Sequence, residues 1–159
     1  MLIYLVQHGK AKTKEEDPKR PLNKEGKKDI EKIAMFLKKS NINIETIMHS
    51  DKLRAKETAE ILSKSINSKN GLKEIPGLQP NDIVEPIATL LNQQSSGNIM
   101  FVGHLPFMSK LSSLLITKNQ DCKIIAFQQG AVVCIEKNEE NEDIETFSLK
   151  WMVTPEIVN

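Results

Sequence analysis

Short apolar runs alternate with longer amphipathic segments along most of this chain, and this alternation limits the possible folds more than any other sequence feature. Runs with the length and β-branched content of buried strands occupy residues 2–6, 42–50 and 99–104. Segments whose apolar residues recur at helical spacing lie at residues 22–40, 51–67, 81–94 and 105–117. Strands that alternate with helices predict an α/β fold, a three-layer sandwich whose mostly parallel central sheet has helices on both faces.

Some local features of these segments can also be predicted. Asn23 is the expected N-cap of the first helix, because its side chain can accept a hydrogen bond from a free backbone N–H. A short strand and a turn are expected at 72–80, and Pro86 is expected to kink the helix at 81–94. The apolar stripe of that helix is expected to comprise Ile83, Ile87, Leu90 and Leu91.

The end of the chain has a different pattern, with strand-like runs in place of helical segments. Strands are expected at 123–127, 131–137 and 144–152. Gly130 and an acidic turn at 138–143 would join them. These runs are expected to add antiparallel strands to the sheet.

Composition argues against several classes of function. The chain has 22 Lys and Arg against 21 Asp and Glu, a net charge of +1, so no overall charge favours nucleic acid or an anionic membrane as a partner. Its two cysteines, Cys122 and Cys134, are too few for a disulfide framework or a zinc site. The first residues lack the basic start and the length of a signal peptide or membrane span, so a cytoplasmic location is expected. Because no repeat or linker interrupts the sequence, residues 1–159 are expected to form one domain.

Polar residues follow three of the predicted strands. They are Gln7-His8-Gly9, His49-Ser50 with Arg54 shortly after, and Gly103-His104. The carboxyl ends of parallel strands meet at one edge of the sheet, where open α/β proteins bind ligands, so His8, His104 and Arg54 are expected to converge. His49 has no neighbouring glycine, and we interpret it as a structural histidine.

These residue types suit the transfer of a phosphoryl group. A neutral imidazole such as that of His8 can attack phosphorus without a metal, and the phosphoryl oxygens then need cationic or N–H donors. Arg54, near a predicted helix N-terminus, can offer a bidentate fork, and a protonated His104 offers another donor. Gly9 would let the backbone approach a phosphate with no side chain in the way.

Four short segments match a known family in order and spacing. They are Gln7-His8-Gly9 with Ala11, Arg20-Pro21-Leu22 with Gly26, Ser50 with Arg54-Ala55 and Thr58, and Gly103-His104 with Pro106. In these segments the chain resembles the histidine phosphatase superfamily, and most closely its small SixA-type phosphohistidine phosphatase branch. The resemblance covers nearly the whole chain, and it implies the phosphoglycerate mutase-like sandwich with no metal and no organic cofactor.

The resemblance also implies roles for individual residues. His8 matches the nucleophile that becomes phosphorylated, and His104 matches the second histidine, which contacts the phosphate and stabilises the transition state. Arg54 matches the arginine that clamps the phosphate, and Arg20 matches a basic residue at the rim of the pocket. The residues expected to bind phosphate are Gln7, Gly9, Arg20, Arg54, His104 and Leu105.

The function implied by the resemblance is the hydrolysis of phosphohistidine on a protein, through a phosphohistidine intermediate on the enzyme. The implied partner is a phosphohistidine-bearing protein, such as a histidine phosphotransfer domain, and phosphate is the product. Larger members insert long segments that cap the site, for which this chain has no room. An open site suits a phosphorylated side chain on another protein.

Two positions depart from the family pattern. Gln7 stands where the family has an arginine, and the loss of one cationic donor would cost about 3–4 kcal/mol, or about 10²–10³ in rate. Lys10 could replace part of that charge, but not a bidentate fork. Gly77 stands where many members place an acidic proton donor, with Glu74 close by in sequence. A phosphorylated imidazole needs such an acid less than an alkoxide does, which favours phosphohistidine over sugar phosphates.

Two alternatives remain open at this point. The departure at Gln7 is compatible with a catalytically weakened module that binds phosphate or a phosphoprotein. A small-molecule phosphomonoesterase is the other alternative, and it requires a general acid that the sequence does not reveal. A mutase is disfavoured, because it must keep water from its phosphorylated intermediate and the chain is too short to close such a site.

Overall fold

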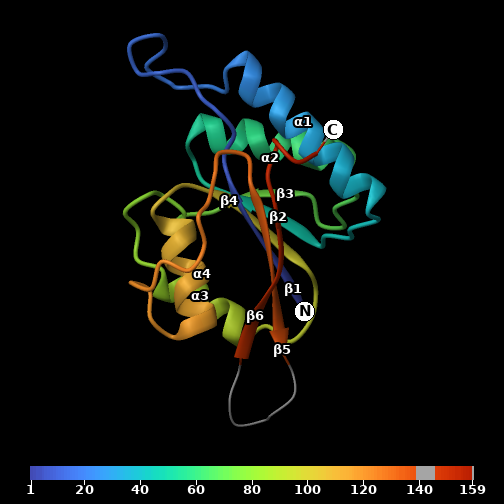
Figure 1. The fold of residues 1–159 in the computed structure, drawn as a ribbon, viewed down its shortest axis with the longest axis vertical. Helices are drawn as coiled ribbons and strands as arrows, with labels where there is room; N and C mark the ends of the chain where they lie inside the picture. The colour runs from blue at the N-terminus through green and yellow to red at the C-terminus, as the bar shows by residue number, and fades with distance from the viewer. Residues whose placement is uncertain (139–145, 159) are drawn as a thin grey trace.

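A six-stranded sheet with two helices on each face makes up the part of the chain that the structure describes, residues 1–138 and 146–158 (Figure 1). The elements of this computed structural model are, in chain order, β1 (Leu2–Gln7), α1 (Lys24–Lys39), β2 (Thr46–His49), α2 (Leu53–Ser65), β3 (Leu72–Glu74), α3 (Glu85–Gln93), β4 (Ile99–Gly103), α4 (Phe107–Thr117), β5 (Val132–Asn138) and β6 (Thr146–Val153). The strand order in the sheet is β3-β2-β4-β1-β5-β6. Strands β3, β2, β4 and β1 run parallel to one another. Strand β5 pairs antiparallel with β1, and β6 pairs antiparallel with β5.

Alternate residues of β1 point to opposite faces of the sheet, and each face has its own core. Tyr4 and Val6 pack with the apolar sides of α1 and α2, whereas Ile3 and Leu5 pack with those of α3 and α4. Figure 1 shows these two helical layers on either side of the strands. Because β1 is covered on both faces and paired on both edges, its sequence is apolar throughout rather than alternating. The α/β fold expected from the sequence is confirmed.

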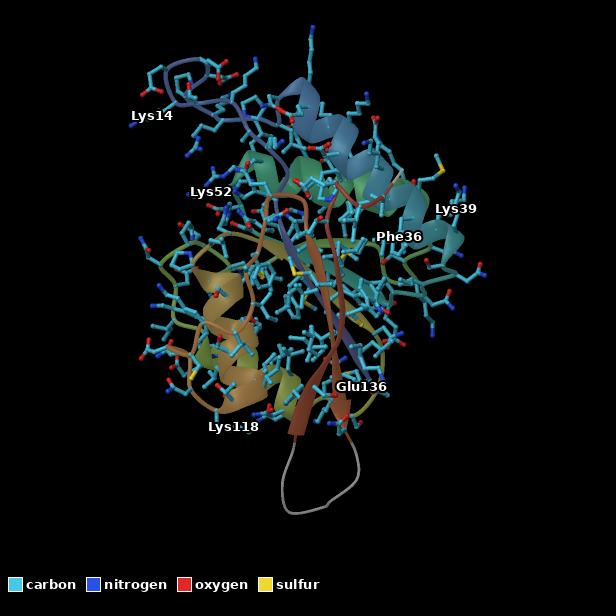
Figure 2. All side chains as sticks on the ribbon, viewed as in Figure 1. Lys14, Phe36, Lys39, Lys52, Lys118 and Glu136 are labelled. Carbon is cyan, nitrogen blue, oxygen red and sulfur yellow. The ribbon has the colours of Figure 1, made fainter. Side chains whose placement is uncertain are left out.

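Helix α1 has the ends that its sequence predicts. Asn23 Oδ1 accepts a hydrogen bond from the Gly26 backbone N–H at 2.7 Å, which confirms the expected N-cap. Glu25 lies in the first turn, and Lys38 and Lys39 lie in the last turn, where Figure 2 shows Lys39 at the end of the helix. These charges complement the helix dipole at both ends.

The expectation for α3 was wrong in its start and in two of the four residues of its apolar stripe, whereas Ile87 and Leu91 are buried as expected. The helix begins only at Glu85, so Pro86 lies in the first turn, where its missing N–H costs nothing, and it does not kink the helix. Ile83 lies outside the helix and is 71% exposed, and Leu90 is 39% exposed. The buried side chains of this segment are those of Val84, at the N-cap, and of Ile87, Ala88 and Leu91 in the helix.

The end of the chain matches the prediction in part. The expected strands at 131–137 and 144–152 correspond to β5 and β6, within the described residues. The stretch at 123–127, expected to be a strand, has no regular secondary structure, although it contains four apolar residues in succession. Most of the expected turn at 138–143 lies outside the described residues. The strand expected at 42–50 is shorter, because only Thr46–His49 pairs continuously with β4.

Gly26 lets α1 approach the chain that follows β1. A Cβ atom at this position would lie 2.7 Å from the Lys10 backbone nitrogen and would also collide with the Lys10 carbonyl oxygen. A hydrogen bond also fixes the position of Lys10, because its carbonyl oxygen accepts from the backbone N–H of Asn23, the N-cap of α1, at 3.0 Å. The contact holds the residues after β1 against the start of α1.

We expect Gly26→Ala to lower the free energy of unfolding by about 1–3 kcal/mol, because the added methyl group meets rigid backbone. The higher helix propensity of alanine, about 1 kcal/mol, offsets only part of this loss. Urea denaturation at neutral pH measures the change. Gly71→Ala is the matched control, since a Cβ there meets nothing within 4 Å and costs only the strain of a positive φ. A Gly26→Ala protein as stable as the wild type would contradict the close approach.

Candidate active site

The carboxyl ends of β1 and β4 and the start of α2 bring two histidines and an arginine together. Gln7 pairs with Gly103 in the register of β1 and β4, so His8 and His104 follow neighbouring strands at the same level. The two imidazole rings have centroids 5.0 Å apart, at 59° to each other. Arg54 reaches them from the first turn of α2. The structure thus places His8, His104 and Arg54 side by side, as their positions at strand ends predict.

Hydrogen bonds orient the ring of His8. Its Nδ1 lies 2.7 Å from the Gly9 carbonyl oxygen, which can only accept, so Nδ1 carries the hydrogen. Its Nε2 then has the lone pair, which accepts a hydrogen bond from Arg54 Nε–H at 3.1 Å and becomes available for attack when Arg54 turns to a phosphoryl oxygen. The arrangement presents Nε2 as a nucleophile with a guanidinium group next to it.

Burial keeps both histidines neutral. The pKa of His8 is lowered to about 4, mainly by desolvation and to a smaller extent by the charges of Arg54 and Arg20, whereas the bond to the Gly9 carbonyl raises it. Desolvation also lowers the pKa of His104 to about 3, with further contributions from His8 and Arg54. A neutral His8 is therefore available as a nucleophile well below the ordinary pKa of an imidazole.

Arg20 lies at the rim of this group rather than among the histidines. Its backbone has a positive φ of 50°, and its Nε donates to the Lys12 carbonyl oxygen at 3.2 Å. Its charge still lowers the pKa of both His8 and Arg54, so it contributes to the positive potential around the site. The side chain of Leu105 packs against the core under α3 and α4. Leu105 could therefore bind phosphate only through its backbone N–H.

The reason for glycine at position 9 differs from the one that the sequence suggested. A Cβ on Gly9 would lie 2.8 Å from Ile30 Cγ1 and 3.1 Å from the Gly26 carbonyl oxygen. Both atoms belong to α1, so the small residue permits the packing of this helix, and the approach of a phosphate stays a prediction. The Gly9 backbone N–H donates to Thr58 Oγ1 at 3.1 Å and is therefore already bonded.

The sequence of residues 3–79, which carries His8, Arg20 and Arg54, matches the model of the histidine phosphatase superfamily (branch 1). Over these residues the chain is similar to the histidine phosphatase superfamily. Phosphohistidine phosphatase SixA of Escherichia coli (strain K12) is 27% identical over 115 residues, which cover 70% of this chain and 71% of that protein. An uncharacterized protein of Picosynechococcus is 25% identical over 166 residues, which cover 96% of this chain and 99% of that protein.

Solved structures of this superfamily have the same fold. The structure of the protein histidine phosphatase SixA complexed with tungstate superposes with a TM-score of 0.82 at 23% identity and covers 98% of this chain and 97% of that one. A putative α-ribazole-5′-P phosphatase from Escherichia coli K-12 superposes with a TM-score of 0.77 at 18% identity, covering 98% of both chains. These superpositions establish a phosphoglycerate mutase-like architecture. The family match and the SixA relative indicate a phosphatase.

Two buried polar atoms in this site lack a hydrogen-bond partner among the described residues: Gln7 Oε1 and His104 Nδ1. Leaving such an atom unpaired costs about 1–3 kcal/mol. They belong to residues at adjacent strand ends, next to His8. Both atoms are therefore available to a ligand or water at the site.

Three residues around the site were not assigned a role from the sequence. Thr58 Oγ1 accepts from the Gly9 N–H and donates to the Arg54 carbonyl oxygen at 2.7 Å, which ties α2 to the end of β1. Ser50 Oγ lies 3.0 Å from His104 Nε2, and Asp51 is bonded to Ser50. Ser50 and Thr58 belong to a segment that matched the family, so their position in that segment was a signal that could have been used.

Position 77, where many family members have an acidic residue, is a glycine in this chain. Gly77 has a φ of +84°, and a Cβ there would meet nothing within 4 Å. A cavity of about 370 Å³ opens beside it, with Asp51, Glu74 and Asp82 among its lining residues. The site has acidic groups at its border, and Asp51 is the carboxylate whose charge acts on His104.

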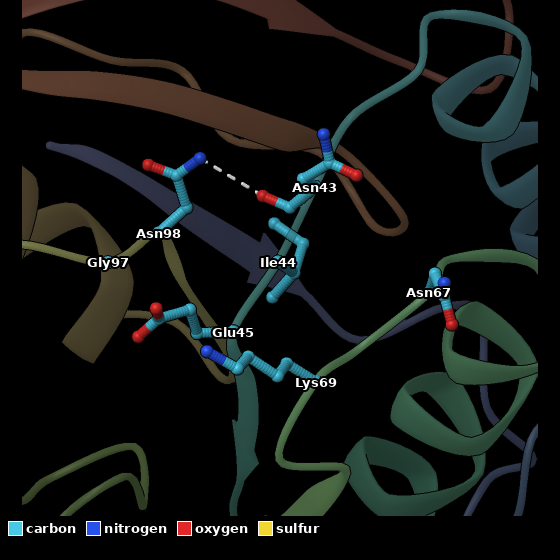
Figure 3. A pocket seen from close by; sticks show the side chains of 7 residues that line it. All are labelled: Asn43, Ile44, Glu45, Asn67, Lys69, Gly97 and Asn98. Carbon is cyan, nitrogen blue, oxygen red and sulfur yellow. Dashed lines mark hydrogen bonds between the residues drawn. The ribbon is translucent and has the colours of Figure 1, made fainter.

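A larger cavity of about 540 Å³ lies at the opposite edge of the sheet, where β2 and β4 begin (Figure 3). Asn43, Glu45, Lys69 and Asn98 are among its lining residues, and Asn98 Nδ2 donates to the Asn43 carbonyl oxygen at 3.0 Å. The length of the strands separates this cavity from the histidines. It is therefore not part of the site described above.

The described residues contain no group of three or more His, Cys, Asp or Glu side chains that could hold a metal ion. Cys122 is exposed and Cys134 is buried in β5, and neither forms a disulfide. None of the helices in the described part of the chain is long and apolar enough to cross a membrane.

We expect the free energy of unfolding to fall as the pH is lowered from about 6.5 to 4.5. His8 and His104 have a lower pKa in the folded state than in the unfolded chain, so the unfolded chain takes up protons first and is favoured by acid. Each histidine is expected to contribute on the order of 2 kcal/mol over this window. Urea denaturation at pH 7 and pH 4.5 measures the loss, and a His8→Gln, His104→Gln protein should lose less. An equal loss in both proteins would assign the acid sensitivity to other groups.

Proposed function

We propose that this chain hydrolyses phosphohistidine on another protein, through a phosphorylated His8. The observation that carries the proposal is the geometry of His8: its Nδ1–H is bonded to the Gly9 carbonyl oxygen, and its Nε2 lone pair faces Arg54. A nucleophile fixed in this tautomer and flanked by a guanidinium group is suited to in-line attack on phosphorus.

The reaction proceeds in two balanced steps. His8 Nε2 attacks phosphorus, the bond from phosphorus to the substrate imidazole breaks, and the substrate leaves as a neutral imidazole because its other nitrogen is already protonated. Water then attacks the phosphorus on His8, the P–N bond breaks and its electron pair returns to Nε2, and phosphate leaves as H₂PO₄⁻ with both protons of the water. Arg54 and His104 stabilise the charge on the phosphoryl oxygens in both steps.

The absence of an acidic residue at position 77 supports a nitrogen leaving group. An alkoxide needs a proton from a general acid as it leaves, whereas a ring-protonated phosphohistidine does not. Gly77 provides no side chain for this purpose, and both histidines are neutral near pH 7 because burial lowers the pKa of each. The proposed partner is a phosphohistidine-bearing protein, such as a histidine phosphotransfer domain, on which residues 1–159 would act as one domain in the cytoplasm.

Comparison of matched peptides tests the proposal. Phosphate release is measured for one peptide sequence carrying phosphohistidine and for the same sequence carrying phosphoserine. We expect release from the phosphohistidine peptide well above its rate in buffer, and little from the phosphoserine peptide. Comparable rates with both peptides would favour the phosphomonoesterase alternative. No release from either would contradict the proposed turnover.

A second candidate function, the binding of a phosphoprotein with little turnover, is favoured by one observation. Gln7 lies where the family has an arginine, it is buried, and its Oε1 has no partner among the described residues. The site therefore has one cationic donor fewer for the transferring phosphoryl group. Binding of a phosphohistidine peptide without release of phosphate would support this second function.

A further inference from the structure

A chain of hydrogen bonds runs from His104 to the surface, and the reaction proposed above makes no use of it. His104 Nε2 lies 3.0 Å from Ser50 Oγ, and the Ser50 hydroxyl donates to Asp51 Oδ1 at 3.1 Å. The other oxygen, Asp51 Oδ2, accepts from Gln79 Nε2 at 3.2 Å and from Lys52 Nζ at 3.4 Å. The carboxylate is thus held toward Ser50 by groups on its far side.

The directions of these bonds determine which nitrogen of His104 carries hydrogen. The single hydroxyl hydrogen of Ser50 is donated to Asp51, so Ser50 Oγ can only accept from His104 Nε2. In the neutral ring, Nε2 therefore carries the hydrogen and Nδ1 has the lone pair. Nδ1 is buried without a hydrogen-bond partner among the residues described. A phosphoryl oxygen that approached this atom would be repelled unless Nδ1 also took up a proton.

We propose that Asp51, acting through Ser50, is a positioning residue for His104, and that it stabilises the imidazolium form whose Nδ1–H donates to a phosphoryl oxygen. The inference rests on the proposed function, because it takes a phosphoryl group as the ligand beside His104. A carboxylate that stabilises an imidazolium and fixes its orientation is known from serine hydrolase triads. Here a serine hydroxyl lies between the two groups. The proton comes from solvent when the anion binds and returns to solvent when phosphate leaves.

The charges around His104 show why it depends on Asp51. Burial lowers the pKa of His104 most, followed by the neighbouring His8 and Arg54, with a smaller contribution from Lys52. Asp51 is the group in this set whose charge raises the pKa. Because the resulting pKa is about 3, the ring is neutral near pH 7 and must gain its proton together with the anion.

Binding of tungstate to the full chain tests the inference, because tungstate is a fully deprotonated oxyanion at neutral pH. Isothermal titration in buffers of different ionisation enthalpy gives both the affinity and the number of protons taken up. We expect the wild type to take up about one proton per tungstate near pH 7. For Asp51→Asn we expect an affinity for tungstate about tenfold lower than that of the wild type at pH 7.5. The pH at which this affinity begins to decline should lie about one pH unit lower than in the wild type.

Two further variants separate the hydrogen-bond chain from the general effect of a negative charge. Asp82 lines the same cavity as Asp51 and accepts from the Gln79 backbone N–H, but it has no bond to Ser50. Asp82→Asn is therefore expected to keep the wild-type proton uptake and pH profile. Ser50→Ala is expected to act as Asp51→Asn does, and the double variant should add nothing to Ser50→Ala. The side chain of Asp51 is 46% exposed, so Asp51→Asn is expected to fold.

The possible results distinguish this inference from the function on which it rests. Tungstate binding without proton uptake would overturn the inference and leave the proposed phosphatase intact. A pH profile of tungstate affinity that is unchanged in Asp51→Asn would also overturn the inference. A shift of this profile in Asp82→Asn equal to that in Asp51→Asn would overturn it too. No tungstate binding, together with no phosphate release from the phosphohistidine peptide, would overturn both.

Discussion

His8→Ala is expected to abolish phosphate release from a phosphohistidine peptide, with a loss on the order of 10⁶-fold. The substitution removes the nitrogen that attacks phosphorus, and no other described side chain has an unprotonated nitrogen bonded to Arg54 in its place. The phosphorylated protein should disappear as well, because its P–N bond forms on His8 Nε2. Mass spectrometry of the quenched protein detects that intermediate, and the peptide assay detects the loss of turnover.

His49→Asn is the control for this variant. His49 is also buried near the end of a strand, but its Nδ1 is bonded to the Ser50 carbonyl oxygen at 3.0 Å, a bond that an asparagine amide can replace. We expect His49→Asn to keep both the phosphorylated protein and its turnover. Turnover that survives in His8→Ala, or a phosphate found on His49, would refute the proposed nucleophile.

Gln7→Arg is expected to raise kcat/KM for the phosphohistidine peptide by about 10²–10³-fold. The added guanidinium group would supply a charged, bidentate donor to the phosphoryl oxygens, where the glutamine has a neutral amide. Gln7 Oε1 has no partner in the described structure, so its removal breaks no hydrogen bond, but the larger charged side chain must fit at a buried position. The assay is phosphate release at low substrate concentration.

Two other variants at position 7 separate charge from geometry. Gln7→Lys adds a charge without a fork, so a smaller gain than that of Gln7→Arg is expected. Gln7→Met removes the polar amide and should lower the rate below the wild type. Equal rates in all four proteins would mean that Gln7 does not limit the reaction, and that the second candidate function has lost its main support.

The sequence predicted most of the fold because its strands and helices have distinct periods. The apolar run of β1 and the helical stripe of α1 each allow one interpretation, and Asn23 marks the helix start. The convergence of His8 and His104 followed from parallel strands alone, since both residues come directly after a strand that ends at the same edge.

Other features depend on contacts between distant residues. The start of α3 was misplaced because Pro86 can either kink a helix or begin one, and the packing of Val84 decides between these. The sequence suggested only the approach of a phosphate as a reason for glycine at position 9. The close contact of Gly9 with Ile30 of α1 has no local sequence signal from which it could be predicted. The bond from His104 to Ser50 joins residues 54 positions apart, and no periodic pattern could predict it.

The position of β1 in the middle of the sheet has a consequence for how the protein is made. Ile3 pairs with Ile99 of β4 and with Ile135 of β5, so β1 leaves the ribosome well before either of its partner strands. Until they emerge, its apolar residues lack their final neighbours, and such pairings over a long sequence separation form slowly. The proposed nucleophile, which follows β1, is therefore synthesised long before the strands that fix its working geometry.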